Sequence, residues 1–341
     1  MDRKSLLRTL TEARQIVITT HVGPDGDAMG SSLGLFLLLR KINPSVQVIV
    51  PNECPEFLHW MPGHDSVLNY SKDKEKIQNF LERADFIFFL DYNDPFRGGL
   101  LEPMLTRSPA RKVLIDHHLS PSIPVDYSIS EVQASSSAEL VLQFIEKELG
   151  LEQLVDKDIA TCLYTGILTD TGCFSYNSSR GETFRRIADL LERGVDKDAV
   201  YSAVYDNFSA SRMRLLGHCL NNMQVFPQYH TALMTLSLEE QKEFEYKNGD
   251  AEGFVNYPLS IHGICFAAFF MEKEDKIKIS FRSKGTFSVN QFARDHFHGG
   301  GHLNASGGEV AGASLSETVS RFIALLPESG CELSPSEGTR T

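Results

Sequence analysis

Short apolar runs and longer segments alternate along the first half of the chain. The short runs are rich in β-branched and aromatic residues and lack polar alternation, which is typical of strands buried on both faces of a parallel sheet. They occupy residues 16–20, 46–50, 84–90 and 112–115. The longer segments are predicted helices at the N-terminus and at 28–42, 135–149, 158–166 and 183–194, and Gly30 and Gly34 would allow close packing of the second. This order predicts an α/β fold whose N-terminal domain has a parallel sheet with helices on both faces.

The pattern changes in the second half. Residues 195–226 are helical but less regular, so we interpret them as a connector. Predicted strands follow at 230–236, 263–271 and 276–282, and the spacing of Val289, Phe292, Ala293 and Phe297 predicts a helix. We therefore expect a first domain at 1–194, a connector helix region, a smaller mixed α/β domain at 227–330 and a flexible tail at 331–341.

Polar residues follow three of the predicted parallel strands. Because the carboxyl ends of such strands meet at one edge of the sheet, we expect these side chains to converge. The candidates are His21, Asp25, Asp27, Asp91, Asp116, His117 and His118, together with Asp170 from a later apolar segment. The alternative for each residue alone is structural, since aspartate often caps a helix.

Carboxylates held this close would repel one another and raise one another's pKa values. Two divalent cations would neutralise them. Carboxylate and imidazole ligands without cysteine favour manganese or magnesium. A two-metal site of this kind suits the hydrolysis of phosphoesters or phosphoanhydrides.

A run of three glycines lies near the C-terminal end of the last predicted helix. Its backbone N–H groups could converge on an anion, or the run could be only a helix cap and a turn. The candidate phosphate contacts are Arg282, Ser283, Gly299, Gly300, Gly301 and His302.

The composition of the chain bears on the size of nucleic acid that it can bind and on the cellular compartment in which it functions. With 341 residues and a net charge of −12, the chain has room for two domains and is poorly suited to neutralising a long nucleic acid. The six cysteines form no C-x-x-C pair, and no apolar run resembles a signal peptide or a membrane span. We therefore expect reduced thiols and a cytoplasmic protein.

The motifs THVGPDGD, FFLDYND, IDHH and GILTDTG resemble the four motifs of the DHH phosphoesterase superfamily, in the same order. FRSKG and GGGHLNASGG resemble the DHH-associated domain. The length and two-domain layout are similar to those of the nanoRNase/pAp phosphatase group. One departure is Ser306, where many relatives carry alanine.

The resemblance implies a role for each candidate. One metal ion would be bound by His21 and Asp25, the other by Asp27, His117 and Asp170, with Asp91 bridging. His118 would lie beside the scissile phosphate, and Asp116 would orient His117. Arg97 matches a position that is often arginine in the family. Arg282 and the loop 299–302 would hold the phosphate of the terminal nucleotide across the cleft between the domains.

The resemblance further implies manganese-dependent hydrolysis of short oligoribonucleotides to mononucleotides, and of 3′-phosphoadenosine 5′-phosphate (pAp) to AMP and phosphate. Magnesium is the second choice of metal. The alternatives are a pyrophosphatase or exopolyphosphatase, a phosphodiesterase for cyclic or linear dinucleotides, and a nucleotide-binding module without activity. The expected partners are short RNA and nucleotide bisphosphates, with no long polymer and no membrane; a homodimer is left open.

Overall fold

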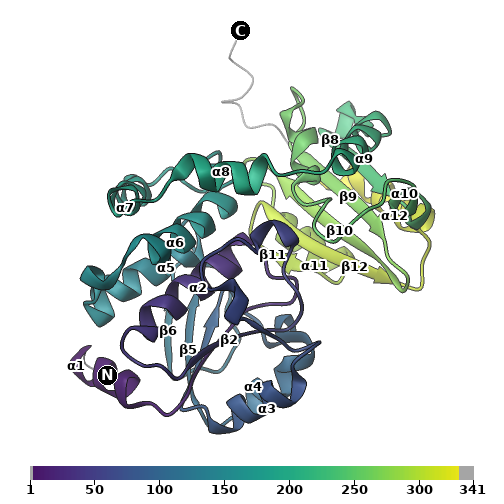
Figure 1. Ribbon diagram of the computed structural model, residues 1–341. Coiled ribbons are helices and arrows are strands. Elements are labelled where there is room, and N and C mark those ends of the chain that lie inside the picture. Colours follow the sequence, from purple (N-terminus) through teal and green to yellow (C-terminus); the bar gives the residue numbers. More distant parts are fainter. Residues whose placement is uncertain (1–2, 330–341) are drawn as a thin grey trace. The chain divides into compact units, whose positions relative to one another are not determined.

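The computed structural model describes residues 3–329, and the chain divides into two compact units (Figure 1). One unit ends at Asn207 and the other begins at Phe208. The division falls inside the expected connector, so helix α8 (Lys197–Tyr205) belongs to the first unit and α9 (Ala210–Asn221) to the second. Within the described residues, every helix is too short or too polar to cross a membrane.

The first unit is built on a six-stranded parallel sheet with the order β3-β2-β1-β4-β5-β6. Its strands are β1 (Ile16–Thr19), β2 (Val46–Val50), β3 (Leu68–Asn69), β4 (Phe86–Leu90), β5 (Arg111–Asp116) and β6 (Tyr127–Ser130). The four predicted strands are confirmed. The two that the sequence pattern did not predict are the edge strands, which are short.

Both faces of this sheet are buried, as expected (Figure 1). Ile16 and Ile18 of β1 face one layer of helices, and Val17 faces the opposite layer. The first layer is formed by α2 (Gly26–Arg40), α5 (Ser137–Gln143) and α6 (Lys157–Asp170), and the second by α3 (Lys74–Arg83) and α4 (Glu102–Arg107). Helix α1 (Arg3–Glu12) packs on the first layer, and α7 (Gly181–Glu192) packs against α6.

Small residues allow α2 and α6 to pack very closely. A Cβ at Gly30 would lie 2.6 Å from the carbonyl oxygen of Cys162, and one at Gly34 would lie 2.6 Å from a methyl carbon of Leu163. The expected close packing at these two glycines is therefore confirmed. This contact brings the start of α2, with Asp27, next to the end of α6, with Asp170.

The second unit contains a mixed six-stranded sheet, in which only β8 and β9 are parallel neighbours. Its strands are β7 (Gln224–Phe226), β8 (Thr231–Leu236), β9 (Phe266–Glu272), β10 (Lys276–Ser283), β11 (Gly300–Gly301) and β12 (Ala305–Ala311). Helices α11 (Val289–His296) and α12 (Leu315–Leu325) cover one face through a cluster of phenylalanines that includes Phe266, Phe281 and Phe322. The other face is covered by α9 and the segment around Phe254, and α10 (Leu238–Glu243) follows β8.

The cysteines fit the expected reduced state only in part. Cys54, Cys162, Cys173 and Cys219 are free thiols. Cys265 is disulfide-bonded, so the expectation of reduced thiols is wrong for this residue. Cys331 and the expected flexible tail at 331–341 lie outside the described residues.

Candidate active site

The loop between β1 and α2 combines helix capping with a cluster of possible metal ligands. Asp25 is the N-cap of α2: its Oδ1 accepts hydrogen bonds from the backbone N–H groups of Asp27 and Ala28, both at 3.0 Å. Its other oxygen, Oδ2, lies 3.8 Å from Nε2 of His21. The capping and ligand interpretations of Asp25 are thus compatible, because each uses a different oxygen.

His21 presents a lone pair to two carboxylates. Its Nδ1 lies 2.9 Å from the carbonyl oxygen of Val22, which can only accept, so Nδ1 carries the proton in the neutral ring. Nε2 is buried without a hydrogen-bond partner and lies 3.3 Å from Oδ2 of Asp91. In a typical histidine metal ligand, one ring nitrogen donates to an acceptor such as a backbone carbonyl, and this orients the other nitrogen toward the metal.

His117 is oriented in the same manner. Its Nδ1 faces the carbonyl oxygen of Ala134 at 3.3 Å, while Nε2 lies 3.4 Å from Asp170 Oδ2, 3.6 Å from Asp91 Oδ1 and 3.9 Å from Asp27 Oδ2. Among the six predicted metal ligands, the potential ligand atoms include two groups, each within 4.8 Å: His21, Asp25 and Asp91, and Asp27, Asp91 and His117. Asp91 belongs to both groups.

Helix α5 begins at the carboxylate of Asp27. The backbone N–H groups of Ser137 and Ala138 donate to its two oxygens at 2.6 and 2.9 Å, so the positive end of the helix dipole faces this charge. Burial, followed by the neighbouring carboxylates of Asp91 and Asp170, nevertheless raises the pKa of Asp27 well above its usual range.

Ser137 is a site residue that the sequence reasoning missed. Its hydroxyl donates to Asp91 Oδ1 at 3.0 Å. Serine is a common helix cap, and Ser136 fulfils this role at the start of α5. The signal that could have identified Ser137 is that three serines are more than one cap requires.

Asp91 has a strained backbone at the end of β4. Its φ of 56° lies in the left-handed region, which is costly for a residue with a Cβ and is often found at functional sites. Burial alone would raise the pKa of this carboxyl, but His118, His21 and His117, in their protonated forms, together lower it well below its usual range.

Asp116 contacts a different histidine from the one expected. Its carboxylate accepts from Nδ1 and from the backbone N–H of His118, at 2.7 and 3.0 Å. The expectation that it orients His117 is therefore wrong, because the carbonyl of Ala134 already occupies Nδ1 of that ring. Nε2 of His118 accepts from Arg97 Nη1 at 3.0 Å, and burial, which outweighs the nearby Asp91, lowers the pKa of His118.

The three glycines of the second unit form a hairpin. The N–H of Gly299 donates to Ala293 and that of His302 to Ala305, so these two groups are not available to an anion. Gly300 and Gly301 pair with Gly307 and Ser306 in β11 and β12. A Cβ at Gly299 would collide with the carbonyl oxygen of Gly307, so close packing of backbones explains the glycine there.

Two of the serines in this region stabilise the backbone. Ser283 Oγ donates to Phe287 and accepts from Asn304, at 2.7 and 2.9 Å. Ser306 Oγ donates to the carbonyl of Gly300 at 2.8 Å, so this hydroxyl joins β12 to β11. Both hydroxyl groups are thus already engaged within the second unit.

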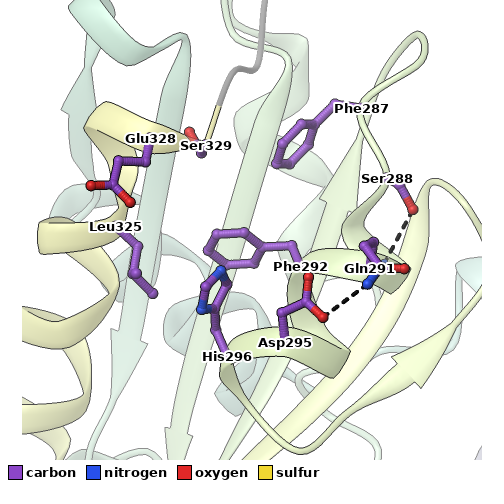
Figure 2. Close-up of a pocket in the computed structure, with 9 residues that line it drawn as sticks. All are labelled: Phe287, Ser288, Gln291, Phe292, Asp295, His296, Leu325, Glu328 and Ser329. Carbon is purple, nitrogen blue, oxygen red and sulfur yellow. Dashed lines mark hydrogen bonds between the residues drawn. The ribbon is translucent and has the colours of Figure 1, made fainter.

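Basic groups of the second unit lie on β10 and α11. Arg282 directs Nη1 to the carbonyl of Phe281 at 2.9 Å. Arg294 was not predicted; its Nε is 3.0 Å from Asn290 Oδ1 and would be 3.8 Å from a Cβ at Gly300. The opposite side of α11 borders a surface depression with Phe292, Asp295 and His296 in its lining (Figure 2). Asp295 accepts there from Gln291 at 2.8 Å, and the depression contains none of the predicted site residues.

The donor set of the first unit fits divalent cations. The carboxylates of Asp25, Asp27, Asp91 and Asp170 converge with the nitrogen lone pairs of His21 and His117. An arrangement of negative charges and lone pairs is repulsive by itself and is stabilised by cations. Oxygen and imidazole donors suit manganese or magnesium.

Comparisons with known proteins place the chain in a family. The models described as "DHH family, N-terminal domain" and "DHHA1 domain" match residues 15–167 and 228–328. The bifunctional oligoribonuclease and PAP phosphatase NrnA of Thermus thermophilus is 30% identical over 315 residues, which are 92% of this chain and 89% of that protein. The chain belongs to the DHH family. The resemblance drawn from the motifs is thereby confirmed.

Two further relatives cover the chain equally fully. NrnA of Bacillus subtilis is 26% identical over 310 residues, 90% of this chain and 93% of that protein. The crystal structure of an exopolyphosphatase-related protein from Bacteroides fragilis has a TM-score of 0.90 and 44% identity, and covers 96% of this chain and 95% of that one. As a DHH family phosphoesterase, the protein is a hydrolase.

Proposed function

We propose that this protein hydrolyses short oligoribonucleotides to mononucleotides and pAp to AMP and phosphate, with divalent metal ions and in the cytoplasm. The observation that carries the proposal is the pair of ligand groups that share Asp91. Its substrates are proposed by analogy with the two NrnA relatives, which are named for these activities.

In this proposal one ion is held by His21 and Asp25. The other ion is held by Asp27, His117 and Asp170, and Asp91 contacts both ions. Manganese is the preferred metal. Such a pair, when bound, supplies a nucleophilic water and neutralises charge on the phosphoryl group. The protein's part is to fix the ligands: Val22 and Ala134 set the tautomers of His21 and His117, and α5 holds Asp27.

Arg97 is the proposed contact of the scissile phosphate, and His118 is proposed to lie beside that phosphate and to position the guanidinium of Arg97. Asp116 holds the proton of His118 on Nδ1, so Nε2 is an acceptor that Arg97 occupies. The guanidinium of Arg97 can give its donors to a phosphate, for which its planar fork is suited. Arg282 and His302 are proposed to contact a second phosphate of the substrate.

An exposed aromatic ring favours a nucleotide over an inorganic chain. Phe96 precedes Arg97 in the turn η3 (Pro95–Leu101), and 90% of its surface is exposed. A nucleobase can stack on such a ring, which contributes about 1–3 kcal/mol per base. Inorganic phosphate chains have no base and gain nothing from it.

A panel of substrates tests the proposal: pAp, the dinucleotide pApA, cyclic di-AMP, pyrophosphate and polyphosphate, each with manganese and with magnesium. We expect hydrolysis of pAp and pApA, and its loss in Asp91→Ala. Phe96→Ala should raise KM for pApA about tenfold with little change in kcat. Leu100→Ala is the matched control, because Leu100 is exposed on the same turn. Hydrolysis of pyrophosphate and polyphosphate alone would contradict the proposal.

An exopolyphosphatase is the second candidate. It is favoured by the name of the Bacteroides fragilis protein, which is described as exopolyphosphatase-related. The same ligand groups would serve that reaction, so the substrate panel rather than metal binding decides between the two.

A further inference from the structure

A second cluster of metal-binding side chains lies in the segment after β2, outside the proposed active site. Cys54, His59 and His64 each offer a ligand atom, and these atoms lie within 4.8 Å of one another. Cys54 Sγ is 3.5 Å from Nε2 of His64, and Nε2 of His59 is 3.4 Å from the carbonyl oxygen of Cys54. The two imidazole rings stack with centroids 4.4 Å apart.

The protonation states of this cluster argue against a reactive cysteine. Burial raises the pKa of the Cys54 thiol to about 11. Burial, followed by the neighbouring His59, lowers the pKa of His64. A thiol whose pKa is raised in this way is mostly protonated near pH 7, whereas a nucleophilic cysteine needs a thiolate.

The surroundings of the cluster do not exclude a cation. Glu53 and Asp65, which adjoin the cluster in sequence, are acidic, and Glu53 is paired with Lys72 at 2.8 Å. The surroundings thus add no unbalanced positive charge that would exclude a cation.

We propose that Cys54, His59 and His64 bind one Zn²⁺ ion, at a site separate from the manganese ligands. One thiolate and two imidazoles form a set that zinc prefers and that manganese and magnesium do not. On binding, the Cys54 S–H bond breaks, its proton leaves to solvent and the sulfur keeps the electron pair that binds the ion. Three protein ligands leave a fourth position for water.

The position of the cluster links it to the active-site loop. Asn52, two residues before Cys54, accepts a hydrogen bond from the backbone N–H of Gly23 at 2.7 Å. Gly23 lies between His21 and Asp25. An ion on Cys54 would stabilise the segment that holds this loop in place.

Co²⁺ provides a direct test, because a cobalt–thiolate bond has a charge-transfer band that carboxylate and imidazole ligands do not produce. The full-length protein, freed of metal, is titrated with Co²⁺ and, separately, with Zn²⁺ under equilibrium dialysis. We expect the thiolate band in the wild type and its loss in Cys54→Ser. This variant should bind one Zn²⁺ fewer per chain, or bind the ion more than about tenfold more weakly.

Cys173→Ser is the matched control, since Cys173 is a free thiol three residues after the proposed ligand Asp170 in the sequence. It should keep the band. His64→Gln should weaken it while preserving the thiol, which covers the case in which Cys54→Ser fails to fold. A band that survives in Cys54→Ser, or no band in the wild type, would overturn the proposal. Manganese-dependent hydrolysis should persist in Cys54→Ser, so this result and the proposed function can fail independently.

Discussion

At the scale of single residues, the aspartates of the site also stabilise the local fold. Asp25 caps α2 with the oxygen that does not face His21. Asp27 accepts from the first turn of α5, and Asp91 takes a left-handed backbone at the end of β4. We therefore expect substitutions at these positions to change stability as well as the proposed metal binding, and the two effects must be measured separately.

Asp91 allows such a separation. A residue with a Cβ at a φ of 56° costs about 1–2 kcal/mol, and glycine avoids most of this cost. We expect Asp91→Gly to be about 1 kcal/mol more stable than Asp91→Ala, although both variants lack the carboxylate that the two ligand groups share. Urea denaturation of both variants in EDTA measures the difference. Equal stability would show that the backbone at Asp91 relaxes once the carboxylate is removed.

At the scale of elements, the contact between α2 and α6 sets the distance between Asp27 and Asp170. Gly166 of α6 is central to it: a Cβ there would lie 2.9 Å from Asp27 Oδ1 and 2.6 Å from the Cβ of Ala138. The absence of a side chain at Gly166 is therefore part of the site, although Gly166 offers no ligand.

Gly166→Ala should displace Asp27 and the start of α5. We expect a loss of about 1–3 kcal/mol in the free energy of unfolding from overpacking, together with weaker manganese binding. Gly217→Ala is the control, because no atom lies within 4 Å of a Cβ there and the change removes a helical glycine. It should raise stability by about 0.5–1 kcal/mol. Thermal unfolding measures the change in stability of both variants, and manganese titration measures the change in metal binding. Unchanged manganese binding in Gly166→Ala would contradict the expected displacement of Asp27.

Helix α10 gives a pH-dependent contribution to stability. Burial alone would raise the pKa of Glu240, but bonds from the backbone N–H of Ser237 and from His218 outweigh it and lower the pKa. A lowered pKa means that the stabilisation is present above the unfolded value near 4.3 and is lost as the pH falls through the folded value.

We therefore expect Glu240→Gln to cost about 1 kcal/mol at pH 7 and progressively less as the pH falls below about 4. Denaturant unfolding of wild type and variant at several pH values measures this difference. Glu317→Gln, in the exposed capping box of α12, should show a smaller pH-dependent difference. A constant difference for Glu240→Gln at all pH values would mean that the carboxylate charge has no part in the cap.

Sequence reasoning worked best where burial determines the pattern. The strands β1, β2, β4 and β5 are apolar because helices cover both sides of them, and the polar residues at or just after the ends of β1, β4 and β5 mark the site. Strand β12 has the sequence ASGGEVA, whose small residues gave no strand signal; its place follows from pairing with β10 and β11. The sequence also could not show which histidine Asp116 contacts. His117 and His118 are adjacent in the chain, and only the folded structure directs them to different acceptors.

At the scale of the whole molecule, the two units differ in what a metal ion can stabilise. The proposed manganese ligands all belong to the first unit, at the ends of β1, β4, β5 and α6. A ligand stabilises the state that binds it, by about 2.7 kcal/mol at a concentration 100 times its Kd.

Manganese should therefore slow hydrogen exchange in the first unit and leave the second nearly unchanged. We expect the largest protection in the loop that follows β1 and in the first turn of α5, where backbone N–H groups bond Asp25 and Asp27. Exchange followed by mass spectrometry, with manganese and with EDTA, measures this. Equal protection of β9 and β10 would contradict the assignment of the ions to the first unit.

The two oxygens of Asp25 suggest how a member of this family could lose its chemistry without losing its fold. Asparagine is as good a helix cap as aspartate, so Asp25→Asn would retain the start of α2 while removing a negative charge from the site. A single base substitution converts an aspartate codon to an asparagine codon, so one mutation could give a stable protein that binds without hydrolysing. Gene copies released from selection for hydrolysis would be expected to accept it earlier than alanine at the same position, which also removes the cap.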